Sequence, residues 1–206
     1  MSEREAVERE LSALRERIGQ LETKLSAPPE HWQASDFYAT YYATTGFFLG
    51  LFAAATSLLF NIVGASFVGK HPLELIKVYL TFPLKDAPLT GQMDSGVTLA
   101  MGCCLYLATG MLLGIPFQLV LTRFAGERST LGWRLLVATI MGIALWLINF
   151  YGILNWLQPL LFGGNWIVEL IPWWVAALTH LVFAWTMAII FPLGLYKPYR
   201  PEVDLQ

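Results

Sequence analysis

Four long stretches without a charged residue constrain this chain more than any other feature. They are residues 37–69, 95–122, 135–168 and 170–196 of a 206-residue sequence. A helix needs about 20 apolar residues to cross a hydrocarbon core about 30 Å thick, and each stretch is longer than that. Only 14% of all residues are charged, against about 25% in an ordinary soluble domain. The sequence therefore predicts an all-α integral membrane protein, and it argues against a soluble enzyme, a secreted disulfide scaffold and a disordered tail.

The predicted architecture is a four-helix transmembrane bundle preceded by a cytoplasmic amphipathic or coiled-coil helix. The spans are expected at about 42–68, 96–121, 135–161 and 171–195, within a bundle of residues 42–196. A coiled-coil helix occupies 1–27, a linker with an aromatic approach to the membrane 28–41, an outer interfacial segment 70–94, and a cytoplasmic tail 197–206. Within the outer segment, we expect a short helix over 72–80 and a turn-rich return from Pro83 onward.

Lysine and arginine residues indicate how the bundle is oriented. With the amino terminus in the cytoplasm, the outer side holds only Lys70, Lys77 and Lys85 among the 13 lysines and arginines of the chain. Counted near the spans alone, as the positive-inside rule requires, the inner side still carries more of them. We therefore expect a multi-pass protein of a bacterial-type cell inner membrane, with both termini in the cytoplasm. A formal charge of −2 offers no basic surface for nucleic acid.

The amino-terminal helix carries a heptad pattern. Apolar residues recur at alternating steps of four and three, the spacing of a coiled-coil seam; they are Val7, Leu11, Leu14, Ile18, Leu21 and Leu25. In a parallel pair, Glu10 would meet Arg15 of the second copy and Arg17 would meet Glu22, whereas Glu3 would oppose Glu8. The alternative is a single helix lying on the membrane surface, but its mixed charges do not suit an anionic lipid surface.

Small residues recur at helical spacing in three of the predicted spans. Two GxxxG motifs join Gly46 with Gly50 and Gly110 with Gly114, and the fourth span carries a ladder of Ala176, Ala184 and Ala188 around His180. In lipid, small residues let helix backbones approach closely. These faces are expected either to associate with another chain or to pack within this one.

Few polar residues lie within the spans. Five of them fall at comparable depth, about 8–15 Å below the outer surface at about 1.5 Å per helical residue; they are Asn61, Cys103, Tyr106, Asn149 and His180. Unsatisfied polar groups are costly in hydrocarbon, so these side chains are expected to converge inside the bundle. They would form either a structural hydrogen-bonded layer or a site for a polar-headed ligand such as a quinone or lipid. The adjacent cysteines, Cys103 and Cys104, are read as packing residues.

The sequence carries no catalytic motif and no intramembrane carboxylate pair. We expect no metal site and no cofactor, although His180 is a conceivable single axial ligand for haem or a pigment. The first hypothesis is a non-catalytic scaffold, assembly or accessory subunit that associates with itself or a larger membrane complex through the coiled coil and the small-residue faces. The alternative is a bundle that binds or passively transports a small molecule, quinone or lipid at the outer polar layer.

Overall fold

The computed structural model describes residues 3–26, 38–67, 69, 71, 74–90, 96–126 and 128–196. Every regular element in these ranges is a helix, which confirms the all-α prediction. The chain divides into two units, one that holds the amino-terminal helix and one that comprises Tyr38–Lys197. The tail from residue 197 onward and most of the predicted linker lie outside the described residues.

The amino-terminal helix, α1, spans Glu3–Ser26. Its length agrees with the helix that the heptad pattern predicts over residues 1–27. Four seam side chains are about half exposed, namely Leu11, Leu14, Ile18 and Leu21, at 47–58%. Val7 and Leu25 also fall within α1, but their side chains lie outside the described part of the chain. Helix α1 therefore presents an apolar row that is exposed among the residues described for its unit.

Four helical segments are long and apolar enough to cross a membrane, so the chain is a multi-pass membrane protein. They are α2 (Ala39–Phe67), α4 (Gly96–Phe124), the continuous run Leu131–Phe162, and α8 (Trp173–Ile190) extended to Gly194 by a 3-10 turn, η2. Large apolar side chains cover the outside of the bundle, and Phe52, Leu112 and Ile189 are 61–62% exposed. Such side chains suit contact with lipid tails rather than with water.

The sequence predicts the third span as one regular helix, but the structure divides it into three helical segments. It consists of α5 (Leu131–Leu147), a π-helical segment η1 (Ile148–Leu154) and α6 (Asn155–Phe162). A π-helical turn widens the backbone locally and shifts the direction of the side chains that follow it. Phe150, within η1, is 3% exposed and turns toward the interior. Periodicity alone does not reveal such a segment, because the residues on either side remain apolar and helical.

The two GxxxG motifs pack against each other within the chain. A Cβ atom added to Gly46 would lie 2.6 Å from the carbonyl oxygen of Gly114, and one added to Gly114 would lie 2.6 Å from the Cα of Gly50. Gly110 faces Ala54 of α2 in the same way. Of the two alternatives expected for these glycine faces, the structure shows packing within the chain, because α2 and α4 bury them against each other.

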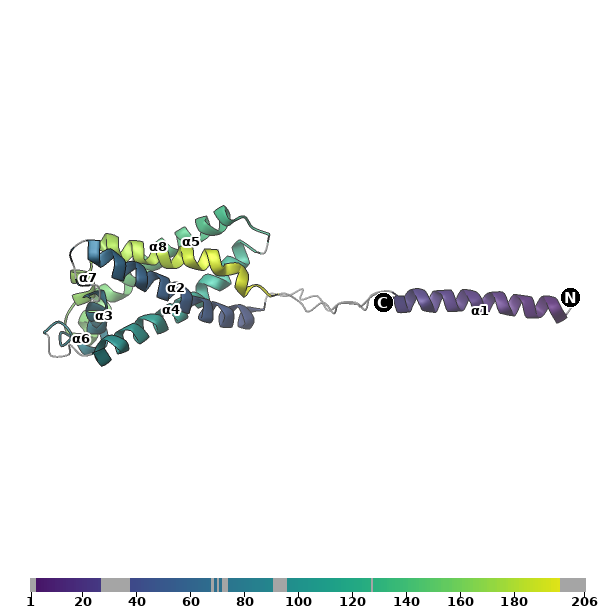
Figure 1. Cartoon of the computed structure of the whole chain (residues 1–206), viewed down its shortest axis with the longest axis horizontal. Coiled ribbons are helices and arrows are strands. Elements are labelled where there is room, and N and C mark those ends of the chain that lie inside the picture. Colours follow the sequence, from purple (N-terminus) through teal and green to yellow (C-terminus); the bar gives the residue numbers. More distant parts are fainter. Residues whose placement is uncertain are drawn as a thin grey trace. The chain divides into compact units, whose positions relative to one another are not determined.

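The alanine ladder of α8 is also buried within the bundle. Ala184 and Ala188 are fully buried, and Ala176 is 6% exposed. A Cβ atom added to Gly142 of α5 would lie 2.9 Å from the Cβ of Ala184, so small residues bring α5 and α8 together as well. Helix α8 packs on both α2 and α5, whereas α4 and α5 touch each other little (Figure 1). The bundle is thus close-packed along three helix pairs and looser between α4 and the third span.

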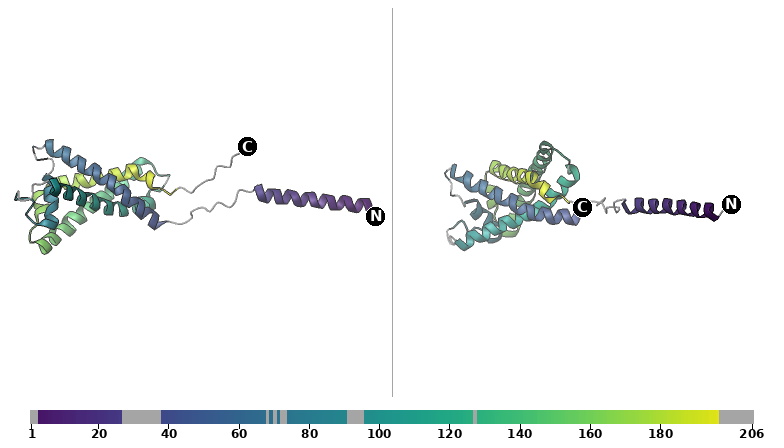
Figure 2. Two further views of the ribbon diagram at one scale, coloured as in Figure 1. Left: turned by 60° about the horizontal axis from the view of Figure 1, so that its bottom comes forward. Right: turned by 45° about the vertical axis from the view of Figure 1, so that its right-hand side comes forward.

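Three short helical elements gather at one end of the bundle, opposite the loop between α4 and α5 (Figure 1). They are α3 (Glu74–Leu84), α6 and α7 (Trp166–Leu170), and the further views in Figure 2 show the same end. The predicted short helix is present as α3 and the predicted turns follow it over residues 85–90, but the helix continues past residue 80, so the return does not begin at Pro83. Pro83 lies inside α3, whose end is followed by Lys85 in the left-handed region at φ 56°.

Proline is tolerated in α3 because the helix gains more from burial than it loses in one backbone hydrogen bond. Ile76 and Thr81 are fully buried, and Leu80 is 2% exposed. The predicted turn after the third span is present, with Gly163 at φ 86° as the left-handed cap of α6. Helix α7, which follows it, is too short for an amphipathic pattern to predict.

Candidate binding cavity

A cavity of about 360 Å³ lies inside the bundle, where α4 and the third span diverge. Residues from all four spans line it, and α3 and α7 contribute Leu75 and Ile167 from the end of the bundle. Two of its lining residues, Leu105 and Ile153, are 36–37% exposed. The cavity therefore reaches the side of the bundle, where the diverging helices meet lipid.

The lining is mostly apolar, with polar side chains from five helical elements among it. They are Ser57 of α2, Tyr79 of α3, Tyr106 and Thr109 of α4, Asn149 of η1, and Thr179 and His180 of α8. No lining residue is Asp, Glu, Lys or Arg. A mainly apolar pocket with a few polar groups is typical of a small-molecule site.

One group of these residues forms a hydrogen-bonded layer between α2, α4 and α8. The hydroxyls of Ser57 and Tyr106 lie 2.7 Å apart, and Ser57 also reaches the carbonyl of Thr179 at 3.3 Å. The Thr179 hydroxyl lies 2.9 Å from Oδ1 of Asn61, while Nδ2 of Asn61 donates to the carbonyl of Ser57 at 2.9 Å. This layer ties three helices together and leaves its members partnered.

Tyr79 connects the outer helix α3 with the span α4. Its hydroxyl donates to the hydroxyl oxygen of Thr109 at 2.6 Å, and Thr109 donates in turn to the carbonyl of Leu105 at 2.9 Å. Burial raises the pKa of Tyr79 above its ordinary value of 10.0, and the hydrogen bond to Thr109 acts in the opposite direction. At neutral pH, Tyr79 is therefore an intact phenol whose single proton is already donated.

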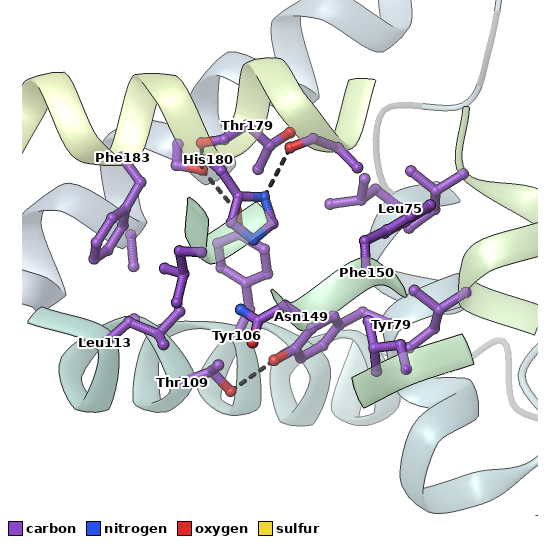
Figure 3. A pocket seen from close by; sticks show the side chains of 18 of the residues that line it. Leu75, Tyr79, Tyr106, Thr109, Leu113, Asn149, Phe150, Thr179, His180 and Phe183 are labelled. Atoms are coloured by element: carbon purple, nitrogen blue, oxygen red, sulfur yellow. Dashed lines mark hydrogen bonds between the residues drawn. The ribbon is translucent and has the colours of Figure 1, made fainter. Parts of the chain in front are cut away.

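His180 and Asn149 remain available to a ligand. His180 Nδ1 donates to the carbonyl of Ala176 at 2.8 Å, and Nε2 makes no hydrogen bond within the described residues. The carboxamide of Asn149 makes none in those ranges either. Figure 3 shows both side chains directed into the space between the helices, with Tyr106 nearby. Buried polar groups in proteins generally have hydrogen-bond partners, so a bound molecule is a natural partner for these two side chains.

The structure brings three of the five predicted polar residues to this cavity, namely Tyr106, Asn149 and His180. Asn61 joins them through Thr179 and lines a second cavity of about 210 Å³ nearer the end of the bundle. Cys103 does not line this cavity, so its place in the polar layer is a wrong prediction; it packs with Leu58, Ile76 and Leu80, in agreement with its interpretation as a packing residue. Cys104 is exposed on the outside of α4.

Sequence reasoning missed four polar lining residues, which are Ser57, Tyr79, Thr109 and Thr179. Serine and threonine give a weak signal because their hydroxyls can bond to a carbonyl of their own helix, as Thr56 does to Phe52. The spacing of Ser57 and Asn61 by one helical turn was the available clue. Tyr79 could be found only by knowing that α3 packs against α4.

The lining of the cavity combines apolar walls with a few polar side chains, and His180 is its one histidine. Within the described ranges, no group of three or more His, Cys, Asp or Glu residues is placed to hold a metal ion. The site is thus characterised by its shape, its apolar walls and the free polar atoms of His180 and Asn149. Comparisons of the chain with protein-family models, with curated proteins and with solved structures find no match.

Proposed function

We propose that this protein binds a small amphiphilic molecule inside the membrane, without catalysing a reaction on it. The observation that carries the proposal is the cavity of about 360 Å³, with apolar walls and the free polar atoms of His180 and Asn149. Its opening beside Leu105 and Ile153 would admit a ligand sideways from the lipid phase. The cavity therefore favours the binding hypothesis over the scaffold hypothesis as the first function.

The charge distribution supports a location in a bacterial-type inner membrane with cytoplasmic termini. Arg123, Arg128 and Arg134 flank or form the loop between α4 and α5, and Lys77 and Lys85 lie at the opposite end, in or beside α3. The larger number of lysine and arginine residues on the first side favours a cytoplasmic location for that side. In that orientation, α3, α6 and α7 cover the outer end of the bundle and the cavity lies in the outer half. We expect no bound cofactor.

Replacement of His180 by leucine is expected to abolish retention of the bound molecule. Leucine has a similar reach but no polar atom, so the change removes Nε2 from the cavity. Wild type and variant would be purified in mild detergent, and the small molecules released from each would be identified by mass spectrometry. A visible absorption spectrum of the same samples tests whether His180 ligates haem or a pigment.

Thr186→Val is the matched control on α8, because the Thr186 hydroxyl bonds only to the carbonyl of Val182 at 2.8 Å and does not line the cavity. This variant should retain the molecule at the wild-type level. Equal retention by the His180 variant and the control, with both folded, would refute the cavity as the binding site.

A second function, as a scaffold or accessory subunit of a membrane complex, is favoured by the exposed row on α1. Leu11, Leu14, Ile18 and Leu21 are 47–58% exposed on one helix. Glu10, Arg15, Arg17 and Glu22 beside them are exposed too, and their order is complementary in a parallel pair. The buried glycine and alanine faces take no part in this proposal, so association rests on α1.

Arg15→Glu is expected to weaken self-association, because Glu10 would then oppose a glutamate of the second copy. The double variant Glu10→Arg with Arg15→Glu restores opposite charges and should recover it. Mass in mild detergent, measured at low salt, reads out the oligomer, and deletion of residues 1–27 gives the dissociated reference. An oligomer unchanged by that deletion would remove the coiled-coil argument.

A further inference from the structure

The lining of the cavity restricts the charge of any ligand. None of its residues is Asp, Glu, Lys or Arg. An ionised head group in such a place would lose its hydration without gaining an opposite charge, which is strongly unfavourable. The lining therefore favours a ligand that is neutral at the depth of His180 and Asn149 over one that carries a carboxylate, a phosphate or an ammonium group there.

The hydrogen-bond inventory restricts the ligand further. The proton of Tyr79 goes to Thr109, that of Thr109 goes to Leu105, and that of His180 Nδ1 goes to Ala176. What remains on these groups accepts hydrogen bonds: Nε2 of a neutral imidazole and the phenol oxygen of Tyr79. Asn149 keeps free donors on Nδ2, together with an accepting Oδ1. The cavity thus offers more accepting atoms than donating ones.

We infer that the ligand is a neutral amphiphile whose head group is a hydroxyl. This rests on the proposed binding function. A hydroxyl can both donate its proton to Nε2 of His180 and accept from Nδ2 of Asn149, and Figure 3 shows these two side chains directed into the same space. A carbonyl or ether oxygen accepts from Asn149 but leaves Nε2 without a donor.

The rest of the ligand is hydrocarbon, because apolar side chains such as Leu113 and Phe183 form the walls. Two sources share this chemistry. One is an aliphatic alcohol or acylglycerol of the lipid phase, and the other is a quinol. For a quinone carrier, the inventory selects the reduced form over the oxidised one, since only the quinol has hydroxyl protons to donate.

The test uses the full-length protein, stripped of lipid and reconstituted in nanodiscs. The probes are decanol, decyl methyl ether and decanoate, and a decyl-substituted benzoquinone with its quinol. Binding is measured by equilibrium partition into loaded against empty nanodiscs, which corrects for uptake by the lipid. We expect decanol to bind at least about tenfold more tightly than its methyl ether, and the quinol at least about tenfold more tightly than the quinone. One hydrogen bond in an apolar site can supply such a factor.

His180→Leu should abolish the preference for the hydroxyl probe, and Thr186→Val should keep it. Should His180→Leu fail to fold, Asn149→Leu provides a second variant. The binding of the probes to the wild-type protein also tests the hydroxyl inference without any variant. Preference for decanol alone identifies a lipid alcohol as the source, and preference for the quinol alone identifies a quinol.

Equal binding of decanol and its ether together with equal binding of the quinol and the quinone overturns the hydroxyl inference while the binding function stands, and so does tightest binding of decanoate. Absence of binding by every probe overturns the inference as well. If, in addition, no molecule is released from the purified wild type, the proposed function also fails. The two conclusions can therefore be refuted separately.

Discussion

Gly114→Ala is expected to lower the free energy of unfolding by about 3 kcal/mol, which is the upper end of the range for an overpacked interior. A Cβ atom there would lie 2.6 Å from the Cα of Gly50 and 2.9 Å from its backbone nitrogen, and it would also meet the carbonyl oxygen of Gly46. These are backbone atoms, so no rotamer change relieves the contact. Helices α2 and α4 must move apart, which also disturbs the cavity between them and α8.

Gly64→Ala is the matched control for this change. Gly64 lies in α2, and a Cβ atom at this position meets nothing within 4 Å. Alanine favours a helix over glycine, so stability should stay the same or rise slightly. Thermal unfolding in mild detergent compares the three proteins. Equal midpoints for Gly114→Ala and the wild type would show that the close approach of α2 and α4 does not hold.

Gln158→Leu is expected to destabilise the outer end of the bundle by about 1–3 kcal/mol, because it leaves buried polar groups without partners. Gln158 is fully buried. Its Nε2 donates to the Thr81 hydroxyl oxygen at 3.0 Å, and its Oε1 accepts from the backbone nitrogen of Ile167 at 3.1 Å. One side chain thus holds α3, α6 and α7 together. Hydrogen exchange should speed up at the Ile167 amide and through α3.

Asn155→Ala serves as the control for the glutamine variant. Asn155 lies at the same end of the bundle and accepts a hydrogen bond from Asn165 at 2.9 Å, but this pair is exposed. Water can replace the lost partner, so the change should stay within about 0.5 kcal/mol. If exchange at Ile167 were as slow in Gln158→Leu as in this control, the three short helices would be held by apolar packing alone.

The sequence predicts those residues of the candidate site that are polar and have mostly apolar neighbours along the chain. Tyr106, Asn149 and His180 stand out in charge-free stretches and do line the cavity. Thr179 does not stand out, because a threonine in a helix can bond to its own backbone, and Thr179 does reach the carbonyl of Val175 at 2.8 Å. Gln158 was overlooked for a different reason, since its partners come from α3 and α7.

The sequence by itself determined the four membrane spans and the helix α1. Removing a charge-free run from water is so favourable, and an unpaired backbone in lipid so costly, that composition decides both the location and the helical form. The heptad spacing in residues 1–27 likewise required only the period of a helix.

Only the tertiary structure decided which helices are neighbours. GxxxG motifs permit close approach of two helices but do not determine which helix is the neighbour. In this structure, Gly46 and Gly50 contact Gly110 and Gly114 of the same chain. The short helix α3 covers Cys103 and brings Tyr79 to the cavity. In lipid, every helix face is apolar enough to meet either lipid or protein, so side-chain pattern leaves these contacts open and the fit between helices determines them.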